Sequence, residues 1–332
     1  MAKPKVFVTR KVFDEALDMI REATDMKLWD SELPPPREVL LREVPDIEGL
    51  YSLLTEKIDR ELFDAAPKLR VVSNMAVGFD NIDLEEATRR GIPVGNTPGV
   101  LTETTADFAF ALLMAAARRV AEGDRYTRAG HWKTWGPMVM LGQDLHNATL
   151  GIIGLGRIGV EVARRAQGFG MRLIYHDAIR NEGAEKEYNI QFYPDMKRLL
   201  AESDFVTLHV PLSPQTRHLI GAEELRAMKT TASLVNTSRG PVVDPKALYE
   251  ALKSGAIASA ALDVTEVEPI AMDDPLLSLD NIIITPHTAS ASVSTRTKMA
   301  VMAAENLLAG LRGEQPPNCP NPEALQARRQ GS

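Results

Sequence analysis

The chain has a single cysteine, Cys319, among its 332 residues. One thiol cannot form an internal disulfide, and no cysteine–histidine zinc pattern surrounds it. The sequence also has no excess of positive charge, because its formal net charge is −7 at pH 7. This balance argues against nucleic acid as a partner. It still allows a small carboxylate ligand, since one arginine or a few backbone N–H groups can dominate a small site.

Long hydrophobic runs are missing as well. The most apolar stretch with helical character covers residues 108–117, whereas a membrane-spanning helix needs about 20 residues. The first residues lead directly into a strand-like segment, without the pattern of a secretory signal peptide. The histidines show no metal-ligand spacing, so we predict no metal. We expect a soluble, cytoplasmic protein without membrane contact.

The sequence does have the composition of an ordinary globular protein, with 44% hydrophobic and 25% charged residues. Its length favours two domains. Short β-branched runs alternate with amphipathic helical patterns, which predicts an α/β fold with helices on both faces of parallel sheets. The alternation starts again near Ala148, so we expect two Rossmann-like, doubly wound domains. Residues 100–287 are predicted to be inserted into a domain made of residues 1–99 and 288–332.

One segment interrupts the alternation. We predict a long helix over residues 107–121, with Thr104 or Thr105 as its N-cap, followed by a polar stretch over residues 122–147 that contains glycines and tryptophans. This stretch is too long for a simple connection and contains two tryptophans. Such a segment is typical of an arm, a binding loop or an oligomer contact.

A glycine-rich motif follows the strand predicted at residues 149–153. It reads GLGRIG, residues 154–159, and opens a predicted helix. The next predicted strand, residues 172–176, leads into Asp177, 21 positions after Gly156. Dinucleotide-binding βαβ units place an acidic residue about 20 positions after their glycines. The context therefore predicts a dinucleotide cofactor, and a nicotinamide in particular.

Each part of this motif has a physical task. Gly154 makes the tight turn, Gly156 lets the backbone approach the pyrophosphate, and Gly159 permits close packing of helix against strand. The helix N-terminus, at Arg157 and Ile158, offers N–H groups and the positive end of the helix dipole to the phosphates.

Asp177 predicts which nicotinamide cofactor is used. Its carboxylate can accept hydrogen bonds from the ribose hydroxyls and would repel a 2′-phosphate, so we predict NAD(H) as the preferred cofactor. NADP(H) remains the alternative, because Arg180 lies three residues further on and could bind that phosphate. The other interpretation of Arg180 is a solvated surface residue.

Further motifs follow the glycine turn in a fixed order. They are NTSRG at residues 236–240, LDV at residues 262–264 leading to Glu268-Pro269, and TPH at residues 285–287. Each motif alone usually marks a turn or a surface site. Their occurrence in this order after the dinucleotide motif favours a functional interpretation. With MAVGFDN at residues 75–81, they resemble the D-2-hydroxyacid dehydrogenase family along nearly the whole chain. NTP (96–98), TAD (105–107) and GHWKTW (130–135) are similar to its glyoxylate/hydroxypyruvate reductase branch.

The resemblance implies hydride transfer from NADH to a 2-keto acid, which gives the D-2-hydroxy acid. His287 would protonate the carbonyl oxygen, a task that suits histidine near neutral pH. Glu268 would pair with His287 and favour its protonated form. Arg239 would hold the substrate carboxylate and polarise the carbonyl. Asp263 would orient the nicotinamide amide.

The resemblance also implies contacts at further positions. At the cofactor we expect Thr105, Gly154, Gly156, Arg157, Ile158, Gly159, Asp177, His209, Val210, Pro211, Thr216, Thr237, Ser238, Asp263, His287 and Ala289. At the substrate we expect Leu53, Val77, Gly78, Arg239 and His287, with backbone N–H groups near Val77 and Gly78 completing a carboxylate cradle. Residues 1–99 and 288–332 would then be a flavodoxin-like substrate domain, and residues 100–287 an NAD-binding domain with a dimerisation arm at about 122–147. Closure of the cleft between the domains would belong to the mechanism.

Two details of the resemblance leave alternatives open. Trp135 would either reach the active site of the second copy in a homodimer or only pack as a buried aromatic of its arm. The family usually has an apolar residue and then glycine after the catalytic histidine, where this chain has Thr288 and Ala289. The methyl group of Ala289 would shift the nicotinamide ring and affect cofactor affinity.

Rival functions lie close to this one. Phosphoglycerate dehydrogenases and D-2-hydroxyacid dehydrogenases of other specificity share the motifs. Formate dehydrogenases of the same fold pair the histidine with glutamine, where this chain has Glu268. A non-catalytic NAD-sensing scaffold is the alternative from another class. The sequence ranks neither the 2-keto acids nor the physiological direction of the reaction.

Overall fold

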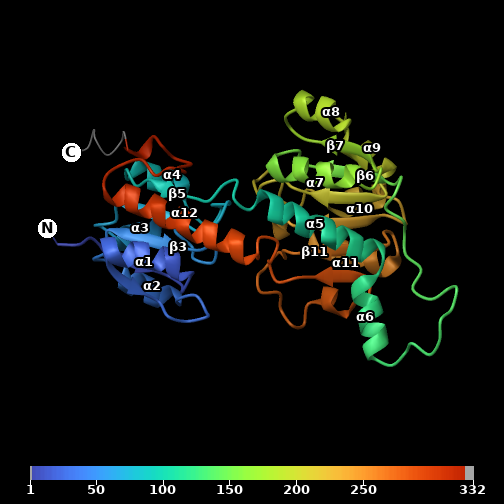
Figure 1. Ribbon diagram of the computed structural model, residues 1–332, viewed down its shortest axis with the longest axis horizontal. Helices are drawn as coiled ribbons and strands as arrows, with labels where there is room; N and C mark the ends of the chain where they lie inside the picture. The colour runs from blue at the N-terminus through green and yellow to red at the C-terminus, as the bar shows by residue number, and fades with distance from the viewer. Residues whose placement is uncertain (1, 326–332) are drawn as a thin grey trace. The chain divides into compact units, whose positions relative to one another are not determined.

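The computed structural model describes residues 2–325, which form two compact units (Figure 1). One unit comprises the chain up to Leu101 and from Ala291 onward, and the other is Thr102–Ser290. Each is a parallel sheet flanked by helices, which confirms the α/β, doubly wound fold class. Within residues 2–325, no helix is both long enough and apolar enough to cross a membrane.

The described part of the first unit is built on a five-stranded sheet with the order β2-β1-β3-β4-β5, the order of flavodoxin-like sheets. Its elements are β1 (Lys5–Val8), α1 (Asp14–Ala23), β2 (Asp25–Leu28), α2 (Arg37–Glu43), β3 (Gly49–Ser52), α3 (Arg60–Ala65), β4 (Val71–Asn74), α4 (Leu84–Arg89), β5 (Val94–Gly95) and α12 (Val293–Leu311). Side chains alternate between its faces. Val6 and Val8 pack under α1 and α12, which lie together in Figure 1, whereas Phe7 faces the core under α2, α3 and α4.

The second unit is built on a seven-stranded sheet with the order β12-β11-β10-β9-β6-β7-β8. Its helices are α5 (Thr102–Ala117), α6 (Val120–Arg128), α7 (Arg157–Gln167), α8 (Glu182–Tyr188), α9 (Met196–Glu202), α10 (Ala222–Ala227), α11 (Pro245–Ser254), and the 3₁₀ helices η1 (Gly240–Val242) and η2 (Pro275–Ser278). Its strands are β6 (Thr149–Ile153), β7 (Arg172–His176), β8 (Gln191–Phe192), β9 (Phe205–Leu208), β10 (Ser233–Asn236), β11 (Ser259–Leu262) and β12 (Ile282–Ile284).

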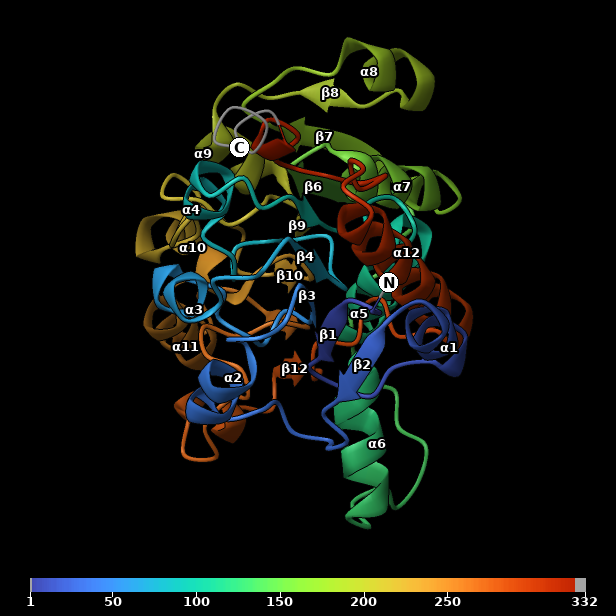
Figure 2. The same cartoon turned by 90° about the vertical axis from the view of Figure 1, so that its left-hand side faces the viewer.

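The order of the strands in this sheet locates the binding edge. The chain runs outward from β6 through β7 to β8, where α8 and β8 lie at the end of the sheet (Figure 2), and then returns to β9 on the other side of β6. Ligands of such sheets bind at this reversal point, outside the carboxyl ends of the strands. Helices α5 and α7 cover one face, and α9, α10 and α11 cover the other.

Two of the predictions about residues 102–147 are wrong. Helix α5 begins at Thr102, so Thr104 and Thr105 lie inside its first turn and cannot be its N-cap. The single helix predicted over residues 107–121 ends at Ala117, and a second helix, α6, begins after Arg119, whose φ is 52°, and extends into the stretch 122–147. No residue of α6 is buried, so the burial pattern that marks other helices is missing. Residues 130–147 contain turns but neither helix nor strand.

Candidate active site

The glycine motif forms the turn between β6 and α7. Gly154 has a φ of 93°, and a Cβ atom built on it would lie 2.8 Å from the carbonyl group of His209. A Cβ on Gly159 would lie 2.2 Å from the carbonyl oxygen of Gly154. Both positions therefore require glycine. A Cβ on Gly156, in contrast, would meet no heavy atom of the described chain within 4 Å, so the backbone there has open space beside it.

Asp177 follows β7 and is fixed next to this turn. Its Oδ2 accepts a hydrogen bond of 2.7 Å from the backbone N–H of Leu155, and its Oδ1 accepts one of 3.1 Å from Ile179. The carboxylate therefore has a defined position beside the residues where the motif predicts the cofactor. Arg180 is engaged elsewhere, because its Nε and Nη2 both donate to Glu185 at 2.8 Å.

The predicted cofactor residues after β9 form the next strand end. His209 is half-buried, and desolvation of its ring lowers its pKa to about 3, so the ring is neutral near pH 7. Its Nε2 lies 2.9 Å from the hydroxyl of Thr207. The hydroxyl of Thr216 donates to the carbonyl oxygen of Pro211 at 2.6 Å and accepts from the N–H of Ser213 at 2.8 Å. Thr216 therefore shapes the turn that follows Val210 and Pro211.

Asn236, to which no role was assigned from sequence, shapes the turn that carries Arg239. Its Oδ1 accepts hydrogen bonds from the N–H and the hydroxyl of Ser238, at 3.0 and 2.8 Å. Its Nδ2 donates to the carbonyl oxygen of Arg239 at 2.9 Å. A Cβ atom on Gly240 would lie 1.8 Å from the carbonyl oxygen of Thr265. The turn therefore packs directly against the loop that leads to Glu268.

His287 and Glu268 form a pair beyond the ends of β11 and β12. Nδ1 of His287 lies 2.7 Å from Oε2 of Glu268. The other carboxylate oxygen accepts from the backbone N–H of Thr265 at 3.2 Å, which orients the carboxylate. An ionised carboxylate only accepts hydrogen bonds, so Nδ1 carries the proton of this bond. The arrangement thereby makes Nε2 the ring nitrogen that can exchange a proton with a substrate.

The backbone of His287 is in the left-handed region, with a φ of 54°, and Asp263 holds it there. Asp263 is buried, and its carboxylate accepts from the hydroxyl of Thr285 (2.7 Å) and the N–H groups of Thr288 (2.8 Å) and Ala289 (2.7 Å). Its carbonyl oxygen accepts from the N–H of His287 at 2.9 Å. Backbone strain of this kind persists only where its surroundings fix it. Asp263 is therefore a positioning residue for His287, and its contact with a nicotinamide amide stays a prediction.

The site shows features that fit a dinucleotide. The hydroxyl of Thr237, at the end of β10, is buried and has no hydrogen-bond partner among residues 2–325. Buried polar atoms without a partner are rare in proteins, and a bound water, ion or ligand commonly satisfies them. The open space at Gly156 and the fixed carboxylate of Asp177 lie at the ends of β6 and β7. Thr105 lies within α5 and is buried.

The first unit holds Leu53, Val77 and Gly78 on loops after β3 and β4. Glu56, for which the sequence predicts no role, is buried and accepts from the N–H of Leu53 and the hydroxyl of Thr9, both at 2.7 Å. Its position in a polar, exposed-looking TEK sequence gave no sign of burial.

Asparagines fix the other loop. Nδ2 of Asn96 donates to the carbonyl oxygen of Val77 at 2.8 Å, and Nδ2 of Asn74 donates to that of Gly78 at 3.2 Å. Asn74 is the last residue of β4 and Asn96 directly follows β5, and side chains of this type commonly shape the turns at strand ends. That position is the signal that could have identified them.

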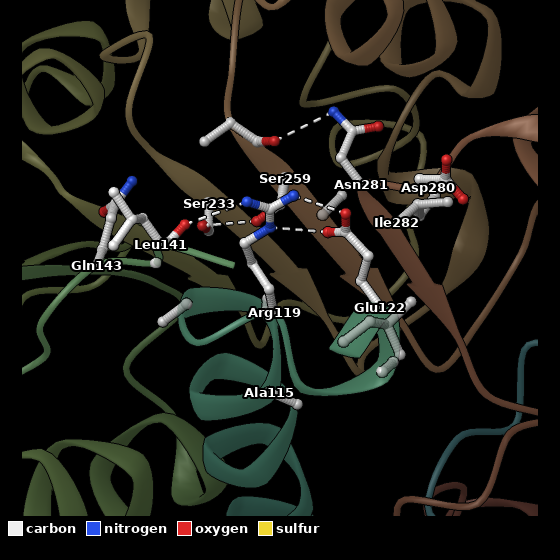
Figure 3. Close-up of a pocket in the computed structure, with 17 residues that line it drawn as sticks. Ala115, Arg119, Glu122, Leu141, Gln143, Ser233, Ser259, Asp280, Asn281 and Ile282 are labelled. Atoms are coloured by element: carbon white, nitrogen blue, oxygen red, sulfur yellow. Dashed lines mark hydrogen bonds and ion pairs between the residues drawn. The ribbon is translucent and has the colours of Figure 1, made fainter. Parts of the chain in front are cut away.

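A pocket of about 410 Å³ lies at the amino ends of the strands of the larger sheet, opposite the carboxyl ends that carry His287 (Figure 3). Ser233 and Ser259, the first residues of β10 and β11, line it and are joined by a hydrogen bond of 2.8 Å. Arg119 reaches into it and is paired with Glu122 at 2.6 Å. The strands are parallel, so this pocket is at their amino ends and does not belong to the site around His287.

The strand-end geometry and comparison with known proteins together define the class of protein. Residues 110–289 match the family model for the D-isomer specific 2-hydroxyacid dehydrogenase, NAD binding domain. The chain belongs to the D-isomer specific 2-hydroxyacid dehydrogenase family, and its second unit binds a nicotinamide cofactor.

Particular relatives narrow the comparison. The chain is 61% identical over 330 residues to the glyoxylate reductase of Korarchaeum cryptofilum, covering 99% of each chain. It is 52% identical over 335 residues to that of Aeropyrum pernix, covering 100% of each. Its fold is similar to that of a solved NADPH-dependent glyoxylate/hydroxypyruvate reductase from Sinorhizobium meliloti in complex with NADP and malonate. That comparison gives a TM-score of 0.86 at 32% identity, over 97% of this chain and 98% of the other.

Proposed function

We propose that this protein reduces glyoxylate and hydroxypyruvate to the corresponding 2-hydroxy acids, in the D configuration where the product is chiral. The observation that carries the proposal is the hydrogen bond of 2.7 Å between Nδ1 of His287 and Oε2 of Glu268. Both residues lie beyond the carboxyl ends of β11 and β12. Arg239 follows β10, the strand adjacent to β11 in the same sheet. The high identity to relatives named glyoxylate reductase supports this choice of substrate.

The proposed chemistry divides between cofactor and side chains. When bound, the reduced nicotinamide supplies a hydride to the carbonyl carbon. His287 gives the proton on Nε2 to the carbonyl oxygen, so that the keto acid gains one hydride and one proton. Glu268 stabilises the positive ring before the transfer and keeps Nδ1 occupied. Arg239 binds the substrate carboxylate through its planar guanidinium group. Leu53, Val77 and Gly78 stay predicted substrate contacts.

We further propose NADH as the preferred reductant. The carboxylate of Asp177 is fixed by two backbone N–H groups, and a 2′-phosphate beside it would meet a like charge. The relative from Sinorhizobium meliloti is NADPH-dependent, so this preference is a property of the individual chain and not of the fold.

The proposal is tested by following the oxidation of NADH and of NADPH with a panel of 2-keto acids. We expect turnover with glyoxylate and hydroxypyruvate, and a kcat/KM at least about tenfold higher with NADH than with NADPH. A preference for NADPH would refute the role given to Asp177. The absence of turnover with every 2-keto acid would support a non-catalytic NAD-sensing scaffold instead.

A homodimer is proposed from the arm, residues 122–147. Trp135 and Met138 are 79% and 78% exposed, and Trp132 and Leu141 are exposed as well. Several exposed large apolar side chains within one short segment are typical of an interface. Trp135 is not buried in its own chain, so its interpretation as a buried packing residue is wrong. We propose that it contacts the second copy.

Light scattering coupled to size-exclusion chromatography should give the mass of two chains at micromolar concentration. Replacing Trp132, Met138 and Leu141 together by serine should shift this mass toward one chain, since the interface would lose its apolar area. Exchanging the exposed Ile179 and Met272 for serine controls for a general effect of surface apolar residues. A wild-type protein that elutes as a monomer would contradict the proposal.

A further inference from the structure

Arg180 is the cation closest in sequence to Asp177 and the residue that could bind a 2′-phosphate. In the structure it forms a two-point ion pair with Glu185 of α8, with Nε to Oε1 and Nη2 to Oε2 both at 2.8 Å. The pair occupies the Nε–Nη2 edge of the guanidinium, one of the edges through which an arginine binds a phosphate at two points. The arginine is therefore already bound to an anion of its own chain.

Glu185 is fixed by more than this one contact. Its Oε1 also accepts from the hydroxyl of Tyr175 at 2.7 Å, and the same hydroxyl accepts from the backbone N–H of Asn181 at 2.8 Å. The guanidinium carbon of Arg180 lies 5.7 Å from the centre of the Phe192 ring. Isolated surface ion pairs are usually weak. This one has two-point geometry and a carboxylate whose side chain is only 17% exposed.

The charges of Arg180, Glu185 and Tyr175 keep these three side chains in contact near neutral pH. Arg180, and then Tyr175, hold the pKa of Glu185 at about 2, so the carboxylate is ionised near neutral pH. Burial, and then Glu185, raise the pKa of Tyr175 to about 12, so its hydroxyl keeps the proton that it donates. The group does not dissociate through titration in the working range of the enzyme.

We infer that Glu185 is a specificity-determining residue, which makes the cofactor site reject NADP(H) by holding Arg180 in an internal ion pair. This inference rests on the proposed preference for NADH and deepens it. Asp177 repels the 2′-phosphate directly, whereas Glu185 withholds the cation that would attract it. The residue acts through Arg180 and needs no contact with the cofactor.

The experiment measures the dissociation constants of NADH and NADPH by fluorescence titration, together with kcat/KM for each. Glu185→Gln should tighten NADPH binding about tenfold and leave NADH nearly unchanged, because a released Arg180 gains a charge-assisted contact with the phosphate. The matched control is Glu182→Gln. It removes the same charge from the same helix, and Glu182 acts on Arg180 only through its charge. The effect of Glu182→Gln on NADPH binding should be much smaller than that of Glu185→Gln.

Arg180→Gln provides an independent test that does not depend on the stability of the first variant. In the wild-type background it should leave NADPH binding unchanged, because the arginine is engaged with Glu185. Combined with Glu185→Gln, it should abolish the gain in NADPH affinity, which shows that the two residues act through each other.

The outcomes separate this inference from the preference itself. Equal effects of Glu185→Gln and Glu182→Gln, in an enzyme that prefers NADH, would overturn the role of Glu185 and leave the role of Asp177 intact. A loss of NADPH affinity in Arg180→Gln alone would show that Arg180 already contacts the phosphate, and would also overturn it. A wild-type preference for NADPH would overturn both.

Discussion

Replacing His287 by asparagine is expected to lower kcat for glyoxylate reduction about a thousandfold, because the reaction loses the group that delivers its proton. Asparagine suits the test for a structural reason. His287 has a φ of 54°, and asparagine is one of the few residues that tolerate this left-handed conformation. The variant should therefore fold and bind NADH with nearly the wild-type dissociation constant.

The chain offers a closely matched control in His218. This residue also has a left-handed backbone, with a φ of 52°, and its Nε2 lies 3.2 Å from a carboxylate oxygen of Glu266. His218→Asn thus removes a second histidine–glutamate pair in the same backbone conformation, and turnover should stay near the wild-type value. Near-normal turnover of His287→Asn, or an equal loss in both variants, would contradict the assignment of His287 as the general acid.

Replacing Arg239 by glutamine is expected to reduce kcat/KM for glyoxylate at least about a hundredfold, since two charge-assisted hydrogen bonds to the substrate carboxylate are lost. The kcat/KM of Arg239→Lys should lie between those of Arg239→Gln and the wild type, because lysine keeps the charge but not the planar two-point geometry. Both substitutions remove the 2.9 Å bond from Nη1 of Arg239 to the carbonyl oxygen of Ser238, but Asn236 still holds the turn through its bonds to Ser238 and to the backbone of Arg239. The backbone should therefore persist in both variants.

Steady-state kinetics and NADH titration distinguish substrate binding from cofactor binding at this position. The dissociation constant of NADH should change little, while KM for the 2-keto acid rises. Arg226→Gln, an exposed arginine of α10, controls for the loss of one positive charge. If Arg239→Gln weakened the binding of NADH as strongly as that of the keto acid, the arginine would belong to the cofactor site instead.

The sequence was most informative where a signal lies within one βαβ unit. The spacing from Gly154 to Asp177 depends on a strand, a turn, a helix and a strand that follow one another. The structure has these elements as β6, the glycine turn, α7 and β7. Arg239, Asp263 and His287 follow β10, β11 and β12, which are neighbours in one parallel sheet. The fold class could be predicted for the same reason, since alternation of strands and helices is a local pattern.

Interactions between distant residues could not be predicted in this way. Glu56 is buried because it binds the hydroxyl of Thr9, 47 positions away, and no local pattern marks such a pair. The carboxylate of Asp263 binds a segment more than 20 positions further along the chain. Helix α6 could not be predicted from sequence for a different reason. It has no buried face in this chain, whereas sequence periodicity detects helices by the side they bury.

The most direct test of the account is the configuration of the product formed from hydroxypyruvate. The enzyme is incubated with hydroxypyruvate and NADH, and the glycerate is resolved by chiral chromatography alongside the loss of NADH absorbance. We expect D-glycerate, formed in a one-to-one ratio with the NADH consumed, and we expect its formation to be lost in His287→Asn. L-glycerate, or glycerate formation that persists undiminished in His287→Asn, would contradict it.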